Sequence, residues 1–464
     1  MGRIKYLIKN SLIFALGTLG TKIINFLLVP LYTNVLLPDE YGIADLVFTL
    51  GTFLVPILIL NINEAILRFS LDKESDSNKI MSVGLLAIIA MVCISLLAYP
   101  LISLYDEISD YSIYVVFYIL SSGCSTIFMY NLRGKEFLIR FSVGNIINAC
   151  TVAFMNILFL KVFGLGVEGY FLAYIVANVV TMMYAFCAGD VFATMRNFSI
   201  DKNLMLAMLK YSIVLIPNSF MWWVMDSSNR VMLTAISGAA VTGMYAIAGK
   251  IPSLVSVVSS IFNQAWNYSA IKESDSSDRL AYNNKIFDYL FFAVMVIASC
   301  ILLVLKPFMS VYVEASYYES WKYTPPLIFG AVVLVLSTFL SSTYTVEKDS
   351  KGFLISATVG AVTNIVLNLA FIPLCGAFGA AISSCLGYTA VFIYRFFDTK
   401  KYLKLSVFTV KHIIQIVCLA VAVVATYCGD IGYAIIAAEL LVLLFVSRQN
   451  ISETLHLVKG LFAK

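Results

Sequence analysis

Charged residues are scarce in this sequence: they make up 12 % of the 464 residues, and there are only two histidines. Hydrophobic residues make up 61 %, and the mean hydropathy is +0.90. A water-soluble protein of this length could not bury so much apolar surface. The composition therefore excludes an ordinary soluble fold and predicts a membrane protein.

Side chains that carry catalysis or bind metals are also poorly represented. The nine cysteines are scattered at spacings that fit neither a metal site nor a disulfide framework. There is no Asp-x-Asp motif, and His412 and His456 fall at the predicted edge of the membrane without a nucleophile–base arrangement. We therefore expect no metal, no cofactor and no enzymatic activity, and the net charge of +4 gives no reason to expect a nucleic-acid partner.

A cleavable signal peptide is not expected, because the first apolar segment, from about Ser11 to Leu37, is too long and has no cleavage site. A helix needs about 20 apolar residues to cross a bilayer, and fourteen segments meet this requirement. Their predicted bounds are 11–36, 42–67, 80–105, 111–132, 141–163, 167–189, 207–236, 241–269, 284–312, 324–346, 353–374, 377–396, 407–428 and 431–447.

Lys and Arg are distributed unevenly between alternate loops. With the amino terminus placed in the cytoplasm, 25 of the 31 basic residues fall on the cytoplasmic side. Only Lys161, Lys306 and Lys322 fall near the outer face, and three more lie within spans. Because basic loops stay on the cytoplasmic side of a membrane, we expect both termini to be cytoplasmic.

An internal repeat indicates how the spans are organised. Residues 137–148 match residues 353–364 at several positions with one offset of 216, and each copy is followed by a Gly-x-x-Gly pair. Internal repeats in polytopic membrane proteins are typical of transporters whose two bundles move around a central site. We expect an all-α fold, with six-helix bundles in residues 1–200 and 201–400 and two further helices with a cytoplasmic tail in 401–464.

Three basic residues, Lys22, Arg230 and Lys250, fall inside predicted spans, as do the acids Asp45 and Asp226. A charge at the bilayer centre costs at least about 2.5–3.5 kcal/mol and normally faces a partner or a wet cavity. Two interpretations remain open. Asp226 and Arg230, four residues apart, form a structural ion pair while Lys22 pairs with Asp45 or extends to the interface; alternatively, the three cations line a cavity for an anionic ligand.

Uncharged polar residues within the spans fit the cavity interpretation. The amides that we assign to it, as candidate ligand contacts, are Asn25, Asn63, Asn229 and Asn263. Intramembrane amides also commonly bond neighbouring helices. Glu64 and Arg68 are four residues apart near the cytoplasmic end of the second span, where an interfacial ion pair is expected. The prolines at 30, 56, 217 and 252 are predicted to bend the first two spans of each half.

Several motifs resemble those of bacterial polysaccharide flippases, in the same order along nearly the whole chain. They are Pro38-Asp39-Glu40-Tyr41-Gly42, the run Trp222 to Arg230, Gly243-Met244-Tyr245 with Lys250-Ile251-Pro252, and Asn364…Asn368…Pro373…Gly376…Gly379-Ala380-Ala381. The chain thus resembles the Wzx-type oligosaccharide-lipid transporters of the multidrug/oligosaccharidyl-lipid/polysaccharide exporter superfamily. The resemblance implies a V-shaped arrangement like that of the multidrug (MATE) transporters, in the bacterial cytoplasmic membrane.

The resemblance also implies a function. Such proteins move undecaprenyl-diphosphate-linked oligosaccharide units, for capsule, O-antigen or exopolysaccharide, from the inner to the outer leaflet by alternating access. The resemblance leaves open whether H⁺ or Na⁺ is a coupling ion. It also leaves open whether the protein contacts polymerase machinery. Arg230 and Lys250 fit basic positions of the family pattern. Many relatives carry Asp-Arg where this chain has Asn229-Arg230. The nearest acid in this chain is Asp226, one turn earlier, and the difference puts any ion-coupling role of such an acid in question.

Three other functions remain in competition. A cation-coupled multidrug antiporter would share the fold, but it needs intramembrane acids, whereas the intramembrane excess here is basic. A flippase for another lipid-linked sugar, such as a peptidoglycan precursor, fits the same features. A membrane glycosyltransferase or polymerase fits least, because it would need a carboxylate pair or a large outer loop.

Overall fold

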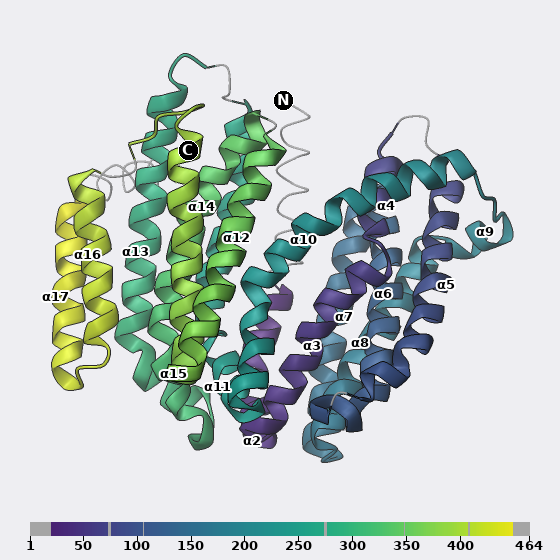
Figure 1. The fold of residues 1–464 in the computed structure, drawn as a ribbon, viewed down its shortest axis with the longest axis horizontal. Helices are drawn as coiled ribbons and strands as arrows, with labels where there is room; N and C mark the ends of the chain where they lie inside the picture. The colour runs from purple at the N-terminus through teal and green to yellow at the C-terminus, as the bar shows by residue number, and fades with distance from the viewer. Residues whose placement is uncertain are drawn as a thin grey trace, which may run out of the picture. The chain divides into compact units, whose positions relative to one another are not determined.

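A computed structural model describes residues 20–72, 76–104, 106–272, 276–347, 349–406 and 409–448 (Figure 1). All regular elements in these ranges are helices, and none of the described residues forms a strand. The terminal arms, which carry Arg3, Lys5, Lys9, His456, Lys459 and Lys464, lie outside the described residues, as do Lys73 and Lys348. The all-α prediction is confirmed for the described chain.

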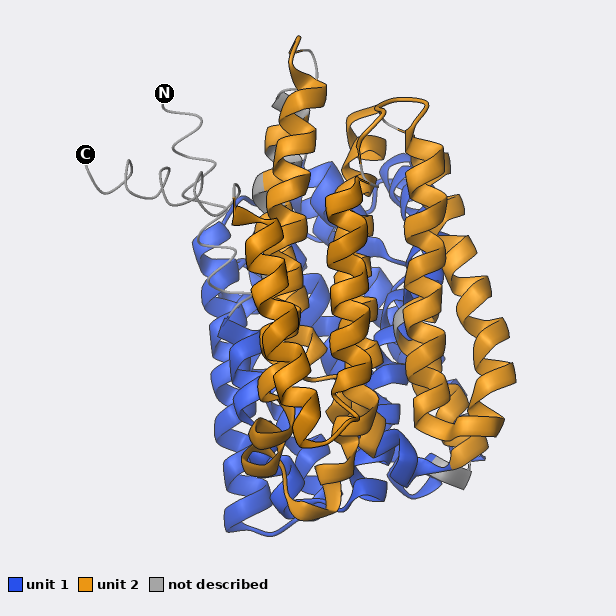
Figure 2. Ribbon diagram, turned by 90° about the vertical axis from the view of Figure 1, so that its left-hand side faces the viewer, with its two compact units in different colours: residues 1–223, 238–243 blue, residues 224–237, 244–464 orange. Residues whose placement is uncertain are grey.

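The chain divides into two compact units, which are coloured separately in Figure 2. The first unit comprises residues 1–223 and 238–243, and the second comprises residues 224–237 and 244–464. The division falls within α10 (Lys202–Ser237) and α11 (Ala239–Ala248). Each of these helices therefore contributes residues to both units.

In the first unit, helical residues 20–27 lead into a series of helices that ends with α10. The bounds are α2 Val29–Val35, α3 Pro38–Leu58, α4 Ile62–Ser70, α5 Ser77–Ile102, α6 Ser112–Gly134, α7 Leu138–Asn156 followed by a π-helical turn Ile157–Val162, α8 Gly166–Ala188 and α9 Val191–Arg196. A short 3-10 helix, Asp106–Tyr111, precedes α6.

The second unit contains longer helices. Their bounds are α12 Pro252–Lys272, α13 Arg279–Tyr312, α14 Thr324–Glu347, α15 Ser350–Thr399, α16 Val410–Ala425 and α17 Asp430–Val446, with a 3-10 helix Ala315–Tyr323 before α14. α16 and α17 pack on each other and on α13.

Each predicted span contains helix, but the helices are not divided as the spans were. Within the described ranges, nine helices are long and apolar enough to cross a membrane, with shorter apolar helices at α11 and α16. The second predicted span is broken between α3 and α4, where Leu60 and Asn61 have φ values of 53° and 51°. The eleventh and twelfth predicted spans are joined as the 50-residue α15, which is interrupted at Gly376.

Three of the four prolines that were predicted to bend the spans lie within a few residues of breaks between helices. Pro30 and Pro252 lie at the beginnings of α2 and α12, where a missing N–H removes no helical hydrogen bond. Pro56 lies in the last turn of α3, just before the break at Leu60. Of the four, Pro217 is the one in the middle of a continuous helix, α10.

The repeated Gly-x-x-Gly pairs form two similar turns. Gly166 and Gly376 have φ values of 55° and 54°, a region that side chains disfavour and glycine tolerates. Three residues later, a Cβ on Gly379 would lie 2.2 Å from the carbonyl oxygen of Phe371, and one on Gly169 would lie 2.8 Å from Cβ of Leu165. The first glycine therefore permits the turn, and the second allows the chain to pack against it.

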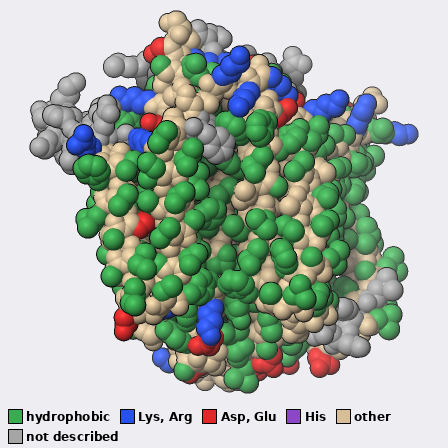
Figure 3. All heavy atoms as spheres, turned by 60° about the vertical axis from the view of Figure 1, so that its left-hand side comes forward, with side chains coloured by type: hydrophobic (Ala, Val, Ile, Leu, Met, Phe, Trp, Pro, Cys, Tyr) green, Lys and Arg blue, Asp and Glu red, His purple; other side chains and the backbone are tan. Residues whose placement is uncertain are grey.

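Large apolar side chains cover much of the molecular surface. Examples are Leu97, Val311 and Leu374, which are 79 %, 87 % and 79 % exposed. On the face shown in Figure 3, a wide hydrophobic band separates Lys and Arg side chains, gathered mostly at one end, from acidic side chains gathered mostly at the other. This surface is suited to lipid, and the protein is a multi-pass membrane protein.

Candidate functional site

A polar cavity of about 240 Å³ lies within the second unit, enclosed by residues of α10, α11, α12, α14 and α15. Leu327, Ala331 and Leu334 of α14 form an apolar wall. The polar lining consists of Asn229, Arg230, Tyr245, Ser253, Ser256, Ser384 and Tyr388. The cavity therefore combines one cation with an amide, three serine hydroxyls and two phenol rings.

Arg230 and Asn229 enter the cavity together from α10, just past the point where this helix passes into the second unit. The Asn229 side chain is buried, whereas that of Arg230 is partly exposed. Both were predicted from the sequence as candidate ligand contacts. The structure therefore brings two of the predicted site residues to one cavity.

Behind the cavity wall, Asn229 is held in a triangle of hydrogen bonds. Its Nδ2 donates to Ser384 Oγ at 2.7 Å and to the Tyr245 hydroxyl at 3.3 Å. The Tyr245 hydroxyl and Ser384 Oγ are themselves 3.1 Å apart. Helices α10, α11 and α15 are thus joined by three uncharged side chains.

Two further asparagines extend this cluster into α15. Asn368 Nδ2 donates to Asn229 Oδ1 at 2.5 Å and to Asn364 Oδ1 at 2.9 Å. Asn364 Oδ1 also accepts from Ser228 Oγ at 3.2 Å. We call Ser228, Asn229, Tyr245, Asn364, Asn368 and Ser384 the amide cluster.

Not every polar atom of the amide cluster is satisfied. Asn364 Nδ2 and Asn368 Oδ1 are buried and have no hydrogen-bond partner among the described residues. An unpaired buried amide atom costs roughly 1–3 kcal/mol. The amide cluster therefore has capacity to bond one more polar group next to the cavity.

Lys250 lies at the break between α11 and α12, partly buried, with its carbonyl oxygen accepting from Ser253 Oγ at 2.5 Å. Its neighbour Gly249 lines the cavity, but Lys250 itself is not part of the described lining. Asn263 lies further along α12, where its Nδ2 donates to Ser259 Oγ at 3.0 Å within the same helix. These two predicted contacts are therefore in the same unit as the cavity but not in its described wall.

The remaining predicted contacts lie in the first unit. Lys22 and Asn25 are exposed on the first helical segment, whereas Asn63 is buried in α4. Asp45 is partly buried in α3. The site roles proposed for these four residues remain predictions.

The expected ion pair between Glu64 and Arg68 is replaced by other contacts. Arg68 Nη1 lies 2.6 Å from Asp72 Oδ1, and Glu64 Oε1 accepts a hydrogen bond from the Tyr130 hydroxyl at 3.1 Å. Asp72, just past the end of α4, is reached more easily by an exposed arginine than the partly buried Glu64. The predicted ion pair between Asp226 and Arg230 involves a side chain, that of Asp226, which lies outside the described part of the structure.

Ser384, Tyr388 and Tyr245 were not assigned to a site from the sequence. Serine and tyrosine are common in membrane helices, and neither type stands out in an apolar segment as a charge does. A usable signal was the spacing of Asn364 and Asn368, which puts both amides on one face of a helix. In the sequence this spacing belongs to a motif that resembles the flippase family, and it does not by itself indicate a site.

The fold defines a class of protein, a polytopic helical membrane protein. The family model described as "Polysaccharide biosynthesis protein" matches residues 7–267. Since this is more than half of the chain, the protein belongs to that family. No curated protein has a significantly similar sequence.

Solved structures with the same fold support this class. The lipid II flippase MurJ in an inward closed conformation aligns with a TM-score of 0.69 and 15 % identity, over 96 % of this chain and 100 % of that one. A multidrug resistance MATE family transporter of the MOP superfamily, inward-facing, aligns with a TM-score of 0.63 and 14 % identity, over 83 % and 93 %. The prediction of a MATE-like fold is confirmed.

Proposed function

We propose that this protein moves an undecaprenyl-diphosphate-linked oligosaccharide from the inner to the outer leaflet of the bacterial cytoplasmic membrane by alternating access. The family match and the lipid II flippase among the structural relatives support a lipid-linked sugar as the substrate class. The uneven distribution of Lys and Arg supports an orientation with both termini in the cytoplasm.

The observation that carries this proposal is the lining of the cavity in the second unit. A diphosphate that leaves water needs a cation, because burying an unpaired charge is prohibitively costly. Arg230 lines the cavity, and its planar guanidinium matches the geometry of phosphate oxygens. Lys250, beside the lining residue Gly249, is proposed as a second cation, and Lys22 as a third.

The uncharged lining is suited to sugars. Ser253, Ser256 and Ser384 offer hydroxyl groups that donate and accept, and Tyr245 and Tyr388 offer aromatic faces. The amide cluster adds the unsatisfied Nδ2 of Asn364 and Oδ1 of Asn368 immediately behind this wall. Asn25, Asn63 and Asn263 are proposed as further contacts during the transport cycle.

The experiment is a deletion strain complemented with variants of Arg230. We expect the deletion to accumulate undecaprenyl-linked oligosaccharide without new sensitivity to cationic drugs. Arg230→Gln should accumulate the same intermediate, with transport lowered roughly thirtyfold for a lost charged hydrogen bond of about 2 kcal/mol. Arg230→Lys should retain part of the activity, because the positive charge remains.

Arg448→Gln is the matched control, since Arg448 is exposed beyond the end of α17. All variants are compared at equal amounts in the membrane. Normal export of the oligosaccharide by the Arg230→Gln variant would show that this cavity is not the transport site. New drug sensitivity without lipid-linked intermediates would instead assign the chain to cation-coupled multidrug antiport.

A flippase for a different lipid-linked sugar, such as a peptidoglycan precursor, is distinguished by the accumulated lipid itself. Mass spectrometry of the extracted lipid identifies its sugars directly. Coupling to H⁺ or Na⁺ is tested by collapsing each gradient separately in vesicles. Contact with polysaccharide polymerase machinery is tested by cross-linking in cells that carry the complete export system.

A further inference from the structure

A second feature of the second unit lies on the surface of α15, away from the cavity. An open groove is lined by Val359, Ala390, Ile393, Tyr394, Phe397 and Asp398. Its lining is mostly apolar, and Ile393 and Phe397 are 46 % and 63 % exposed. Residues 390–398 extend over about 12 Å of helix, which is a path for a hydrocarbon chain.

Close packing between the two parts of α15 forms this groove. A Cβ on Gly360 would lie 2.3 Å from Cγ2 of Val391, and one on Gly387 would lie 3.2 Å from Cβ of Asn364. The helical segments on either side of Gly376 therefore approach closely at small residues. Val359 and Ala390, next to these contacts, leave a recess between larger side chains.

The ammonium group of Lys400 lies at one end of the groove. Lys400 Nζ lies 4.0 Å from the ring centre of Phe396 and 5.0 Å from that of Phe397, which lines the groove. No acidic partner is found for Lys400 within the described ranges. Its ammonium group therefore adds positive charge where α15 leaves the apolar band.

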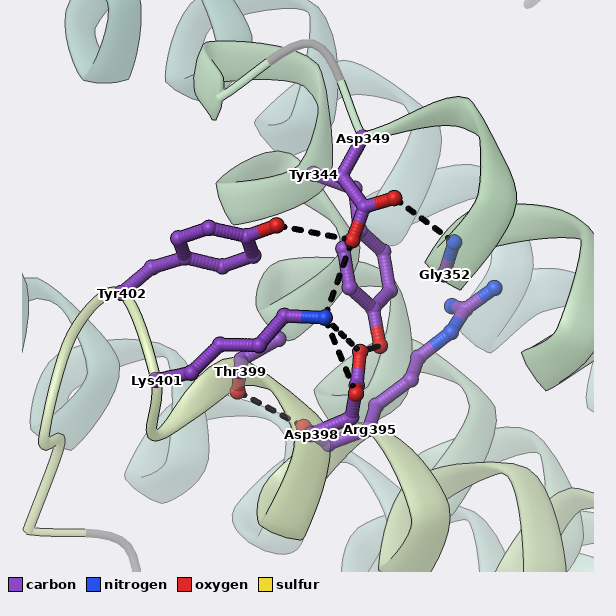
Figure 4. A network of polar contacts seen from close by, with 8 residues as sticks. All are labelled: Tyr344, Asp349, Gly352, Arg395, Asp398, Thr399, Lys401 and Tyr402. Atoms are coloured by element: carbon purple, nitrogen blue, oxygen red, sulfur yellow. Dashed lines mark hydrogen bonds and ion pairs between the residues drawn. The ribbon is translucent and has the colours of Figure 1, made fainter.

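The acid at this end of the groove is already neutralised, as Figure 4 shows. Asp398 accepts from Lys401 Nζ at 3.0 Å and 3.1 Å and from the Tyr344 hydroxyl at 2.8 Å. The same Lys401 Nζ lies 3.1 Å from Asp349. Lys401 is thus shared between the two acids, and Lys400 forms no ion pair with either of them among the described residues.

We propose that this groove binds an anionic phospholipid of the surrounding bilayer, with one acyl chain along Val359, Ala390 and Phe397 and its phosphate against Lys400. A lysine near a membrane surface attracts an anionic lipid by about 1 kcal/mol. The apolar groove orders the acyl chain of the lipid, and the ammonium group of Lys400 selects an anionic headgroup. The lipid is a resident of the protein, and its binding is independent of the transported molecule.

The geometry disfavours the tail of the transported lipid as the occupant. A helix turns about 100° per residue, which puts Ser384 and Tyr388 on roughly the opposite side of α15 from Ala390, Tyr394 and Phe397. The first two line the polar cavity, and the last three line the groove. A molecule with its head in the cavity would therefore not reach the groove along this face.

The test is native mass spectrometry of the full-length protein in detergent, titrated with phosphatidylglycerol or phosphatidylethanolamine. We expect the wild type to prefer phosphatidylglycerol, and Lys400→Gln to lower that affinity about fivefold without changing the affinity for phosphatidylethanolamine. Lys400→Arg should restore the preference. Ala390→Phe, which fills the groove, should weaken both lipids.

Lys404→Gln is the matched control, because Lys404 is an exposed lysine four residues further along the chain that is not part of the groove. If Lys404→Gln lowered the affinity for phosphatidylglycerol as much as Lys400→Gln does, the proposal would be overturned, since the effect would then reflect overall charge. Unchanged binding in Ala390→Phe would overturn it too. Displacement of phosphatidylglycerol by undecaprenyl phosphate at equal concentration would reassign the groove to the transported lipid.

Discussion

At the scale of single residues, the buried polar groups of the second unit are the most informative. Asn229, Asn364 and Asn368 are nearly inaccessible, and they bond to one another and to Ser228, Tyr245 and Ser384. Buried polar groups contribute to stability only while they are paired. The amide cluster therefore fixes α10, α11 and α15 in one arrangement beside Arg230.

Removing one amide from this cluster should destabilise the protein. Asn368→Ala deletes the bonds to Asn229 Oδ1 and Asn364 Oδ1, and we expect a loss of about 1–3 kcal/mol in the free energy of unfolding. Thermal unfolding of the purified protein measures the effect as a lower midpoint. Asn25→Ala is the control, because Asn25 is exposed and should change the stability by less than about 0.5 kcal/mol. Equal midpoints for both variants would contradict the structural role.

The contacts of Asp349 lead to a prediction about pH. The backbone N–H of Gly352, together with Lys401 and Tyr402, lowers the pKa of Asp349 from 3.8 to about 2. A carboxyl group whose pKa is lowered by folding stabilises the folded protein while it is ionised. This stabilisation is complete above the pKa that the group has in the unfolded chain, and it is lost as the pH falls through the pKa that the group has in the folded protein. The ammonium group of Lys401, paired with Asp398 and Asp349, has a raised pKa, so its contribution is lost only above about pH 10.5.

Asp349→Asn should therefore lower the unfolding midpoint by a constant amount between about pH 5 and pH 9. Below pH 4 the midpoints of the variant and the wild type should converge. Melting curves at a series of pH values provide the measurement. A difference that changes between pH 6 and pH 8 would show that another group controls this end of α15.

At the scale of elements, two glycines determine how closely helices approach in the first unit. A Cβ on Gly42 of α3 would lie 1.9 Å from the carbonyl oxygen of Ala239, and one on Gly243 of α11 would lie 2.0 Å from that of Pro38. Both glycines belong to sequence motifs that resemble those of polysaccharide flippases. The structure supplies their physical reason, which is direct contact between two backbones.

Adding a single methyl group at this contact should separate the two helices. We expect Gly42→Ala to destabilise the protein by about 1–3 kcal/mol, as overpacking does in a close-packed interface. Gly20→Ala is the matched control, since a Cβ on Gly20 meets nothing within 4 Å. Thermal unfolding and the amount of protein in the membrane are compared. Wild-type stability in Gly42→Ala would mean that α3 and α11 can move apart without cost.

At the scale of the whole molecule, the distribution of charge is the basis of the orientation that we propose. The described Lys and Arg side chains gather mostly at one end of the face in Figure 3, as the assignment of alternate loops requires. Lys400, Lys401 and Lys404, which lie just after α15, are among the basic residues that we assign to the cytoplasmic side.

Single cysteines in a cysteine-free background test this orientation. An impermeant thiol reagent added to intact cells should label positions near Pro38, Asp106 and Gly238, and should miss positions near Lys73, Lys202 and Lys401. The same reagent should reach the second group once the membrane is permeabilised. The opposite pattern would invert the topology and contradict the direction of transport proposed here.

The amino-acid sequence was sufficient to predict the membrane class, the helical fold and the approximate location of the apolar segments. Those properties depend on local composition, because lipid requires every backbone polar group to be satisfied within a helix. It also singled out Arg230 and Asn229, since a charge or an amide is conspicuous in an apolar segment. The Gly-x-x-Gly turns at Gly166 and Gly376 were likewise visible as a repeated pattern.

Which polar residues meet depends on how the helices pack, and this could not be predicted from the sequence. Ser384 and Tyr388 are more than 150 positions from Arg230 along the chain, and no periodicity links them to it. Arg68 pairs with Asp72 instead of Glu64, and Lys250 lies outside the described cavity wall, because side-chain contacts depend on which helix faces pack together. Local composition specifies that a segment crosses the membrane as a helix. The rotation of that helix, and therefore its partners, is set by packing against its neighbours.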